Sequence, residues 1–307
     1  MKRIHLDTDL GSDTDDLAAL AMLLGWPNVE LTGITTVSDP DGRRAGMTGY
    51  ALTLAGRDDV PVTAGAAGSL AGFTIELAFP AHHWPEPVEP RPSPPGAATE
   101  ALVAAAERGD TIVAIGPYTN LAIVEAVRPG LLASTEVVVM GGHVPPMPAG
   151  YPTWDASIDT NVQQDAYASA VVLDRCRPTV VPLSTCGRVT LKASQLEALR
   201  SGGPLARLVA DQAEALGREH GLTELGRSFP ALPDDLLNFQ YDPLACAVAA
   251  GWEGVTVEEL PVGTRLGYGL LHLSIEEGAP RRRIVTDVDA PAFDGAWVTA
   301  VLRASGR

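Results

Sequence analysis

The sequence predicts one α/β domain, residues 1–307, in which helices flank a mostly parallel central sheet. Short runs rich in β-branched residues alternate with longer segments rich in alanine and leucine, the order that produces strand–helix–strand units. The chain has 307 residues, 46% hydrophobic and 20% charged, so it can bury one large core. Crossovers of such units are right-handed, so the loops after the strands meet at one rim, where we expect the active site.

The predicted elements begin with a strand at Ile4–Leu6 and a helix at Leu17–Leu24. Further strands are predicted at Val29–Val37, Thr111–Ile115, Val137–Met140 and Arg177–Leu183. Further helices are predicted at Ala97–Arg108, Leu121–Ala126 and Asp165–Asp174, and helical periodicity recurs around Leu205–Leu216. The residues after about 250 are predicted only as additional strands and helices.

Two proline-rich segments interrupt this pattern. The first, Phe79–Pro95, carries His82, His83 and Trp84. Proline removes backbone donors that a helix or central strand needs, so we expect a surface loop there. The second, His143–Thr153, contains four prolines. Both lie between strands of one apparent sheet, which favours loops or lids over domain boundaries.

The net charge of −16 and the isoelectric point of about 4.7 limit the partners of this protein. Its field repels nucleic acid and anionic membranes and tolerates cations and neutral polar ligands. Cys176, Cys186 and Cys246 are widely spaced in or beside apolar runs, so we expect buried, reduced thiols. The sequence shows neither a signal-peptide pattern nor an uncharged apolar run of about 18 residues. We therefore expect a soluble cytoplasmic protein.

The strongest functional signal is the segment from Asp7 to Asp16, which places five carboxylates within ten residues. Like charges this close repel, and each is costly to bury unpaired, so a folded chain that keeps them together is expected to bind a cation. The oxygen ligands suit Ca²⁺ or Mg²⁺ rather than zinc or copper. A solvated acidic turn that caps the next helix is the alternative interpretation, and the spacing does not fit an EF-hand loop.

Four later segments carry polar residues at expected strand ends. They are Ile115-Gly116-Pro117-Tyr118-Thr119-Asn120, Met140-Gly141-Gly142-His143, Asp159–Asp165 and Asn238–Pro243. Together with the N-terminal cluster, these motifs resemble the inosine-uridine nucleoside hydrolase family, from residue 4 to about residue 250 and in the family's order. The resemblance implies a Rossmann-like sheet with a Ca²⁺ at its rim and hydrolysis of an N-ribosyl bond.

Carried over residue by residue, the resemblance implies that Ca²⁺ is held by the carboxylates of Asp9, Asp16 and Asp242 and by the backbone carbonyl of Ile115. The ion would bind the ribose 2′ and 3′ hydroxyls and the attacking water, and Asp9 would take the proton of that water as general base. The family has two fewer residues between the glycine and the Asp-Asp pair. Asp13 is therefore an additional carboxylate without an assigned role.

The same resemblance implies that Asp15 and Asn161 grip the ribose hydroxyls. Asp159 stands where the family commonly has glutamate, and Thr153 stands where a family asparagine often touches the 5′ hydroxyl. Hydroxyl contacts that strengthen in the transition state raise the rate of bond cleavage. These four residues are the candidates for binding the sugar.

The residue expected beside the leaving base differs from the family pattern. Tyr241 stands immediately before Asp242, where many members have a histidine that protonates the base. Tyrosine, with an ordinary pKa of about 10, is poorly matched to neutral pH. The expected acid is therefore a loop histidine, or the base departs while stacked on an aromatic side chain. The candidates are His82, His83, His143, Trp84, Tyr151, Trp154 and Tyr241.

The resemblance thus implies a Ca²⁺-dependent hydrolase that cleaves a ribonucleoside to ribose and free base, and it also implies a homo-oligomer, a dimer or a tetramer. Two other interpretations stay open. One is a hydrolase specialised for a modified nucleoside or another N-riboside, and the other is a non-catalytic, Ca²⁺-stabilised sugar-binding protein. A nucleotide substrate is not expected, because no cationic or glycine-rich anion site surrounds these motifs.

Overall fold

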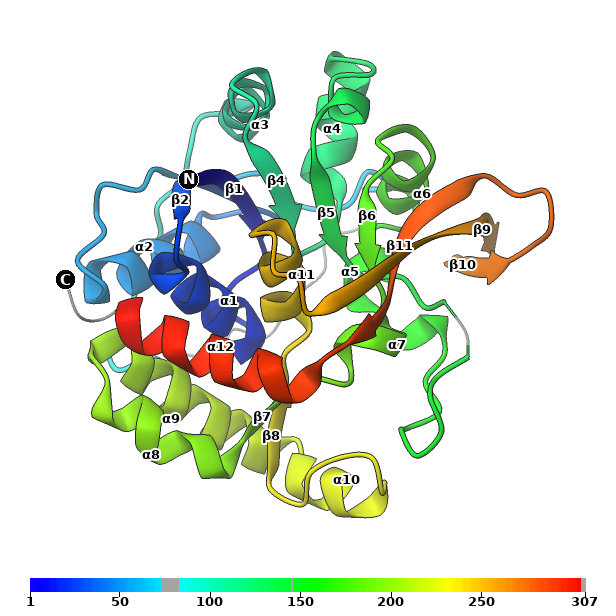
Figure 1. Ribbon diagram of the computed structural model, residues 1–307. Coiled ribbons are helices and arrows are strands. Elements are labelled where there is room, and N and C mark those ends of the chain that lie inside the picture. The colour runs from blue at the N-terminus through cyan, green and yellow to red at the C-terminus, as the bar shows by residue number, and fades with distance from the viewer. Residues whose placement is uncertain (73–82, 145, 305–307) are drawn as a thin grey trace.

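A central sheet of nine strands organises the part of the chain that the computed structural model describes, residues 1–72, 83–144 and 146–304 (Figure 1). The strand order is β10-β9-β11-β6-β5-β4-β1-β2-β3. The strands from β11 to β3 in this order run parallel, whereas β9 and β10 are antiparallel additions. Their bounds are β1 (Lys2–Thr8), β2 (Val29–Thr36), β3 (Val62–Thr63), β4 (Thr111–Ala114), β5 (Val137–Met140), β6 (Thr179–Val181), β9 (Val255–Gly267), β10 (Leu270–Ile275) and β11 (Arg281–Val288).

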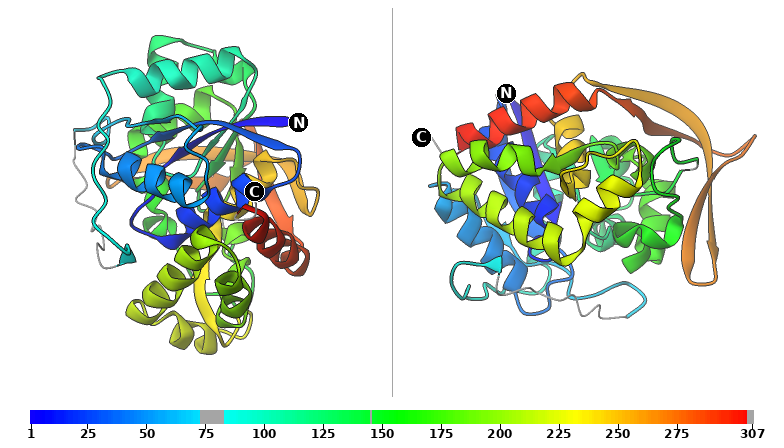
Figure 2. Two further views of the ribbon diagram at one scale, coloured as in Figure 1. Left: turned by 90° about the vertical axis from the view of Figure 1, so that its left-hand side faces the viewer. Right: turned by 90° about the horizontal axis from the view of Figure 1, so that it is seen from below.

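Helices cover both faces of this sheet, and the β9–β10 hairpin extends from one side of the molecule (Figure 2). The helices are α1 (Thr14–Gly25), α2 (Arg43–Leu54), α3 (Ala97–Glu107), α4 (Thr119–Val127), α5 (Thr160–Gln164), α6 (Ala166–Arg175), α7 (Leu183–Cys186), α8 (Leu196–Ser201), α9 (Pro204–Glu219), α10 (Leu222–Ser228), α11 (Tyr241–Ala249) and α12 (Ala290–Ala304). A second, two-stranded sheet pairs β7 (Thr190–Lys192) with β8 (Leu236–Phe239).

The side chains of the central strands alternate between two hydrophobic cores. In β5, Val138 and Met140 join a core that includes α1, α9, α11 and α12, whereas Val137 and Val139 join a core that includes α3, α4 and α6. Successive residues of a strand point to opposite faces, so a strand covered on both faces must be apolar at nearly every position. This requirement accounts for the continuous apolar sequence of β5.

The direction of strand addition reverses between β1 and β4. The chain passes from β1 to β2 and β3 on one side, and β4 then pairs with the other side of β1, with Leu6 opposite Val113. At such a switch point, the loops after adjacent strands diverge and leave a crevice at the carboxyl ends. Asp9 follows β1 and Ile115 follows β4, so both lie beside this crevice.

Most predicted elements are confirmed, with small shifts at their ends. One predicted strand is shorter in the structure than the sequence suggested. The strand predicted at Arg177–Leu183 covers only Thr179–Val181. Arg177 has a positive φ of 50°, which is incompatible with an extended strand, and Leu183 already begins α7.

The described part of the proline-rich segment Phe79–Pro95 is mostly an exposed loop, as predicted, but its first described residues are buried. His82 lies outside the described residues, whereas Trp84 is buried. The ring of Trp84 packs edge-on against Tyr50 of α2, with 5.9 Å between the ring centroids. The prediction of a surface loop is therefore wrong at Trp84, because the large apolar area of the indole favours burial against the neighbouring helix.

The three cysteines are free and buried, as predicted. Burial raises the pKa of Cys176 to about 12, so this thiol stays protonated at neutral pH and is a poor nucleophile. Within the described ranges, no helix combines the length and apolarity needed to cross a bilayer.

Gly25 provides a test of the packing between the first and last helices. A Cβ at this position would lie 1.9 Å from the carbonyl oxygen of Ala300 in α12. We expect Gly25→Ala to lower the free energy of unfolding by about 1–3 kcal/mol, because the two helices must move apart. At Gly295 of α12 a Cβ meets no atom within 4 Å, so Gly295→Ala should instead raise the free energy of unfolding by about 0.5–1 kcal/mol. Urea unfolding of both variants checks the opposite signs, and equal effects would contradict the close packing.

Candidate active site

A cavity of about 320 Å³ lies at the carboxyl ends of the central strands. Its walls come from the ends of β1, β4 and β5 and from the first turns of α1, α5 and α11. It contains eight of the residues predicted for the site: Asp9, Asp15, Asp16, Ile115, Asp159, Asn161, Tyr241 and Asp242. The fold therefore brings the separate sequence motifs to one place.

Three buried carboxylates form the most acidic part of the cavity. One oxygen atom each of Asp15, Asp16 and Asp242 lies within 4.8 Å of the other two. Burial, followed by repulsion from neighbouring carboxylates, raises the pKa of each of the three well above its usual value. Oδ1 of Asp242 is buried and has no hydrogen-bond partner among the described residues. A divalent cation would relieve both the repulsion and the unpaired oxygen, and this all-oxygen donor set fits a hard ion such as Ca²⁺.

The start of α1 holds two of these carboxylates in place. Oδ1 of Asp13 accepts a hydrogen bond from the backbone N–H of Thr14 at 2.5 Å and caps the helix. The same oxygen accepts a hydrogen bond from Nδ2 of Asn238 in β8 at 2.6 Å. The hydroxyl of Thr8, at the end of β1, donates to Asp16. The additional Asp13 thus caps α1 and connects it to β8.

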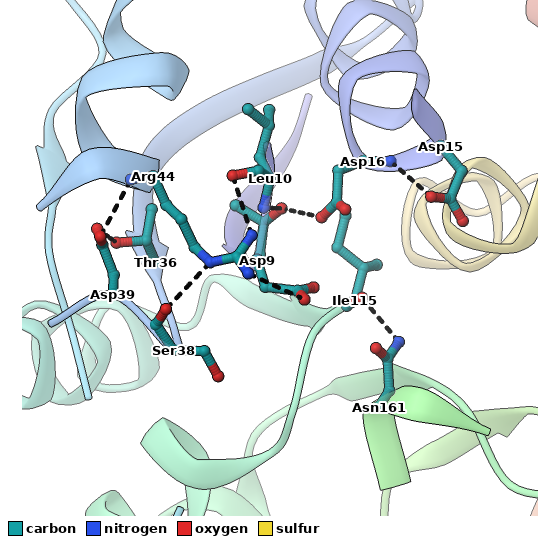
Figure 3. Close-up of polar contacts among 11 residues, drawn as sticks. Asp9, Leu10, Asp15, Asp16, Thr36, Ser38, Asp39, Arg44, Ile115 and Asn161 are labelled. Carbon is teal, nitrogen blue, oxygen red and sulfur yellow. Dashed lines mark hydrogen bonds and ion pairs between the residues drawn. The ribbon is translucent and has the colours of Figure 1, made fainter. Parts of the chain in front are cut away.

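Asp9 lines the same cavity without belonging to the group of three. Its Oδ2 lies 3.9 Å from Nη2 of Arg44, which is completely buried (Figure 3). Arg44 also donates to the carbonyl oxygens of Ser38 at 3.1 Å and Leu10 at 3.2 Å. Burial raises the pKa of Asp9, and the positive charge of Arg44 opposes that rise. Arg44 therefore favours the ionised form of Asp9.

The loop after β4 is positioned from two sides. A Cβ on Gly116 would lie 2.7 Å from Oδ1 of Asp9, so only glycine allows the backbone to approach this closely. On the other side, Nδ2 of Asn161 donates to the carbonyl oxygen of Ile115 at 2.8 Å (Figure 3). The carbonyl that was predicted as a metal ligand is therefore next to the amide that was predicted to bind ribose.

Asp159 lines the cavity, but backbone groups occupy both of its carboxylate oxygens. Oδ1 accepts a hydrogen bond from the N–H of Val162 at 3.1 Å and caps α5, and Oδ2 accepts one from the N–H of Gly142. Burial raises the pKa of Asp159 to about 6, although these two hydrogen bonds favour its charged form. Asp159 thus fixes α5, which carries Asn161, to the end of β5.

Several candidates for the base and the 5′ hydroxyl do not line this cavity. Thr153 is exposed, and His143 is half-buried outside the cavity wall. Nε2 of His83 lies 3.0 Å from a carboxylate oxygen of Glu219, and Trp84 packs in the core. Their sequence positions in proline-rich loops carry no information about which side of the loop faces the cavity.

An aromatic cluster lies behind Tyr241. The ring of Tyr241 stacks on Phe239 with 5.2 Å between the ring centroids. Trp154 contacts both rings edge-on, with centroid distances of 5.1 Å to Phe239 and 6.2 Å to Tyr241. Tyr151 packs against the same cluster. Burial, followed by the nearby thiol and carboxylates, raises the pKa of Tyr241 well above its usual value. Tyr241 thus presents an aromatic wall to the cavity.

Sequence reasoning missed Arg44 and His220. Arg44 lies in α2, and His220 follows the last residue of α9 and lines the cavity. Neither residue belongs to one of the acidic or glycine-containing motifs, so no local pattern marks them. Only the packing of α2 and α9 against the ends of the strands reveals them.

The fold is an α/β fold with an acidic cavity at the carboxyl ends of its strands, and three buried carboxylates in that cavity could hold a cation. The chain matches the family described as "Inosine-uridine preferring nucleoside hydrolase" over residues 4–295, and it belongs to this family. It is therefore a hydrolase that acts on N-glycosyl bonds, as the motifs predicted.

Individual proteins resemble the chain over nearly its full length. The Pyrimidine-specific ribonucleoside hydrolase RihA of Klebsiella pneumoniae subsp. pneumoniae is 27% identical over 305 residues, which cover 94% of this chain and 95% of that protein. The structure of a plant nucleoside hydrolase, the PpNRh1 enzyme, superimposes with a TM-score of 0.79 at 19% identity and covers 98% of this chain and 99% of its own. The Purine-Preferring Ribonucleoside Hydrolase from Gardnerella vaginalis gives a TM-score of 0.78 at 20% identity, with 99% of each chain covered. The structural matches confirm the fold.

Asp7 is a further buried carboxylate, located near the end of β1. Its Oδ1 accepts hydrogen bonds from the hydroxyl of Thr35 at 2.5 Å and from Nδ2 of Asn120 at 2.8 Å. Burial raises the pKa of Asp7 from 3.8 to about 7, and these hydrogen bonds oppose the rise. The folded protein thus binds a proton at Asp7 more tightly than the unfolded chain does. The stability from this proton is fully present below about pH 4 and is lost as the pH rises through about 7.

Asp7→Asn tests this linkage. The amide keeps an acceptor for Thr35 and Asn120 but does not titrate, so the fall in the free energy of unfolding from pH 5 to pH 8 should be smaller than in the wild type. We expect a difference of at least about 1.4 kcal/mol, the value of one pKa unit. Urea unfolding at several pH values, with chelator present, measures it, and the exposed Asp234→Asn serves as the control. Parallel pH profiles for wild type and Asp7→Asn would contradict the assignment.

Proposed function

We propose that this protein is a Ca²⁺-dependent hydrolase that cleaves a ribonucleoside to ribose and free base in the cavity at the carboxyl ends of the strands. The observation that carries the proposal is the buried group of Asp15, Asp16 and Asp242 in that cavity. Three carboxylates this close require a cation when they are ionised. The family of the chain supplies the reaction, hydrolysis of an N-glycosyl bond.

We assign the cation to Asp16 and Asp242, together with Asp9 and the carbonyl of Ile115, all of which line the cavity. When bound, Ca²⁺ would supply positive charge that fixes the ribose hydroxyls and makes a water molecule more acidic. Asp15, the third carboxylate of the group, faces the same space and is assigned to a ribose hydroxyl. In this arrangement the charge of the cation balances carboxylates whose mutual repulsion the protein offsets only in part.

Asp9 is the proposed general base. Cleavage of the N-ribosyl bond builds positive charge at the anomeric carbon, and a water molecule that attacks there must lose a proton. A base must be ionised before it accepts a proton, and the guanidinium of Arg44, 3.9 Å away, favours the carboxylate form of Asp9. Arg44 is therefore a positioning residue that acts through Asp9.

Asn161 is the proposed partner of Asp15 in holding the ribose. Its amide lies on α5, and Asp159 ties the start of α5 to Gly142 and so fixes the direction of the amide. Because both oxygens of Asp159 already accept backbone hydrogen bonds, we assign Asp159 to positioning rather than to direct contact with the sugar. Fixed hydrogen bonds to hydroxyls contribute to catalysis when they strengthen in the transition state.

The base that this enzyme removes is to be identified with a substrate panel. One relative is named as pyrimidine-specific and a structural neighbour as purine-preferring, so the shared substrate class is the ribonucleoside. Release of ribose from uridine, cytidine, inosine and adenosine, with and without chelator, defines the preference. Release without chelator and its loss with chelator support the proposal, and the absence of release from all four would contradict it.

Calcium binding gives a second test that does not depend on activity. Calorimetric titration of the chelator-treated wild type should show one Ca²⁺ per chain. Asp242→Asn removes one charged ligand and should weaken the affinity by at least about tenfold. The same substitution at the exposed Asp234, close to β8, should leave the affinity unchanged. An unaltered affinity in Asp242→Asn would remove this residue from the metal site.

Asn161→Ala tests the ribose site. We expect kcat/KM for the preferred ribonucleoside to fall on the order of 100-fold, with kcat reduced, because the lost contact strengthens in the transition state. The 2′-deoxy form of that nucleoside should lose turnover in the wild type for the same reason. Ribose release and thermal unfolding are measured together, so that a loss of activity is separated from a loss of folding. A value of kcat/KM within about twofold of the wild type would show that the assignment is wrong.

A further inference from the structure

We propose that His220 is the general acid that protonates the departing base. This inference rests on the proposed function and extends it to the part of the reaction that the motifs leave unexplained. His220 lies directly after α9, is exposed, and lines the cavity that also contains Asp9, Asp15 and Tyr241. A purine or pyrimidine leaves poorly as an anion, so a proton donor at the base lowers the barrier to bond cleavage.

Tyr241 is poorly suited to this role. The ring is stacked on Phe239 and touches Trp154 edge-on. These contacts suit a wall against which a planar base packs, and they leave the proton to another residue.

Among the histidines in the described part of the chain, His220 is the one that lines the cavity. His5 is inside β1, where burial lowers its pKa to about 4. His83 contacts Glu219, and burial lowers the pKa of His143, which is absent from the cavity wall. His272 lies on β10, also away from the cavity wall.

His220 is an exposed residue at a helix end that other contacts hold in place. Its backbone N–H donates to the carbonyl of Leu216 at 2.9 Å, in the last turn of α9. Gln212, one turn earlier, donates to the backbone carbonyl of His83 at 3.3 Å, and Glu219 contacts the ring of the same His83. The end of α9 is therefore anchored, while the exposed imidazole can turn toward a base in the cavity. Histidine is the side chain that ordinarily changes charge between about pH 5 and 8.

The proposed proton transfers balance. The bond between the anomeric carbon and the base nitrogen breaks, its electron pair stays on the base, and the base takes a proton from the imidazolium of His220. The oxygen of the attacking water bonds to the anomeric carbon, and a proton of that water passes to Asp9. Exchange with solvent then returns the proton from Asp9 and restores the imidazolium.

The test compares two kinds of leaving group in His220→Ala and His220→Asn. For the preferred ribonucleoside, kcat should fall by about 100-fold or more. For p-nitrophenyl β-D-ribofuranoside, whose phenolate leaves without protonation, kcat should stay within about threefold of the wild type. The same change at a histidine outside the cavity wall, His272→Asn, should affect neither substrate. Because His220 is exposed, its variants should keep the thermal unfolding midpoint of the wild type.

Three results would overturn the proposal. They are an unchanged kcat for the nucleoside, an equal loss with both substrates, or the selective loss in Tyr241→Phe or His82→Ala instead of in the His220 variants. Failure of the proposed function gives a different result, since the wild type would then hydrolyse neither substrate.

Discussion

Electrostatic repulsion among buried carboxylates is the constraint on which the site depends. Asp15, Asp16 and Asp242 share a small space, and each ionisation makes the next more costly. The helix N-terminus, the hydroxyl of Thr8 and the guanidinium of Arg44 each offset part of this cost. The proposed Ca²⁺ balances the remainder, so that binding of the cation and stability of the folded site are linked.

The rest of the fold supplies the rigidity that this arrangement needs. Helices pack on both faces of the parallel sheet, and the strands end at one edge where neighbouring loops diverge. Gly116 lets one of these loops approach Asp9, and Asp159 fixes the helix that carries Asn161. A close backbone approach and buried carboxylates are unfavourable by themselves, and they persist here because the surrounding core holds these segments in position.

The sequence was informative wherever function depends on short, continuous motifs. The runs of apolar residues predict the central strands, and the motifs that contain Asp9, Asn161 and Asp242 predict which residues meet in the cavity. The sequence was uninformative where the location of a side chain depends on packing between distant segments. Trp84 was one candidate for stacking on the base but is buried against α2. Arg44 of α2 contacts Asp9, and His220 at the end of α9 lines the cavity, although no sequence motif marks either residue.

The hydrogen bond between Asp13 and Asn238 joins residues 225 positions apart in the chain. It connects the helix that carries Asp16 to the strand that leads into Asp242, so the two halves of the cluster meet only when the C-terminal third of the chain has docked. In chain order, β1 to β6 precede Asp242, whereas β9, β10, β11 and α12 follow it. The proposed cation site is therefore incomplete until the segment that carries Asp242 has joined the start of α1.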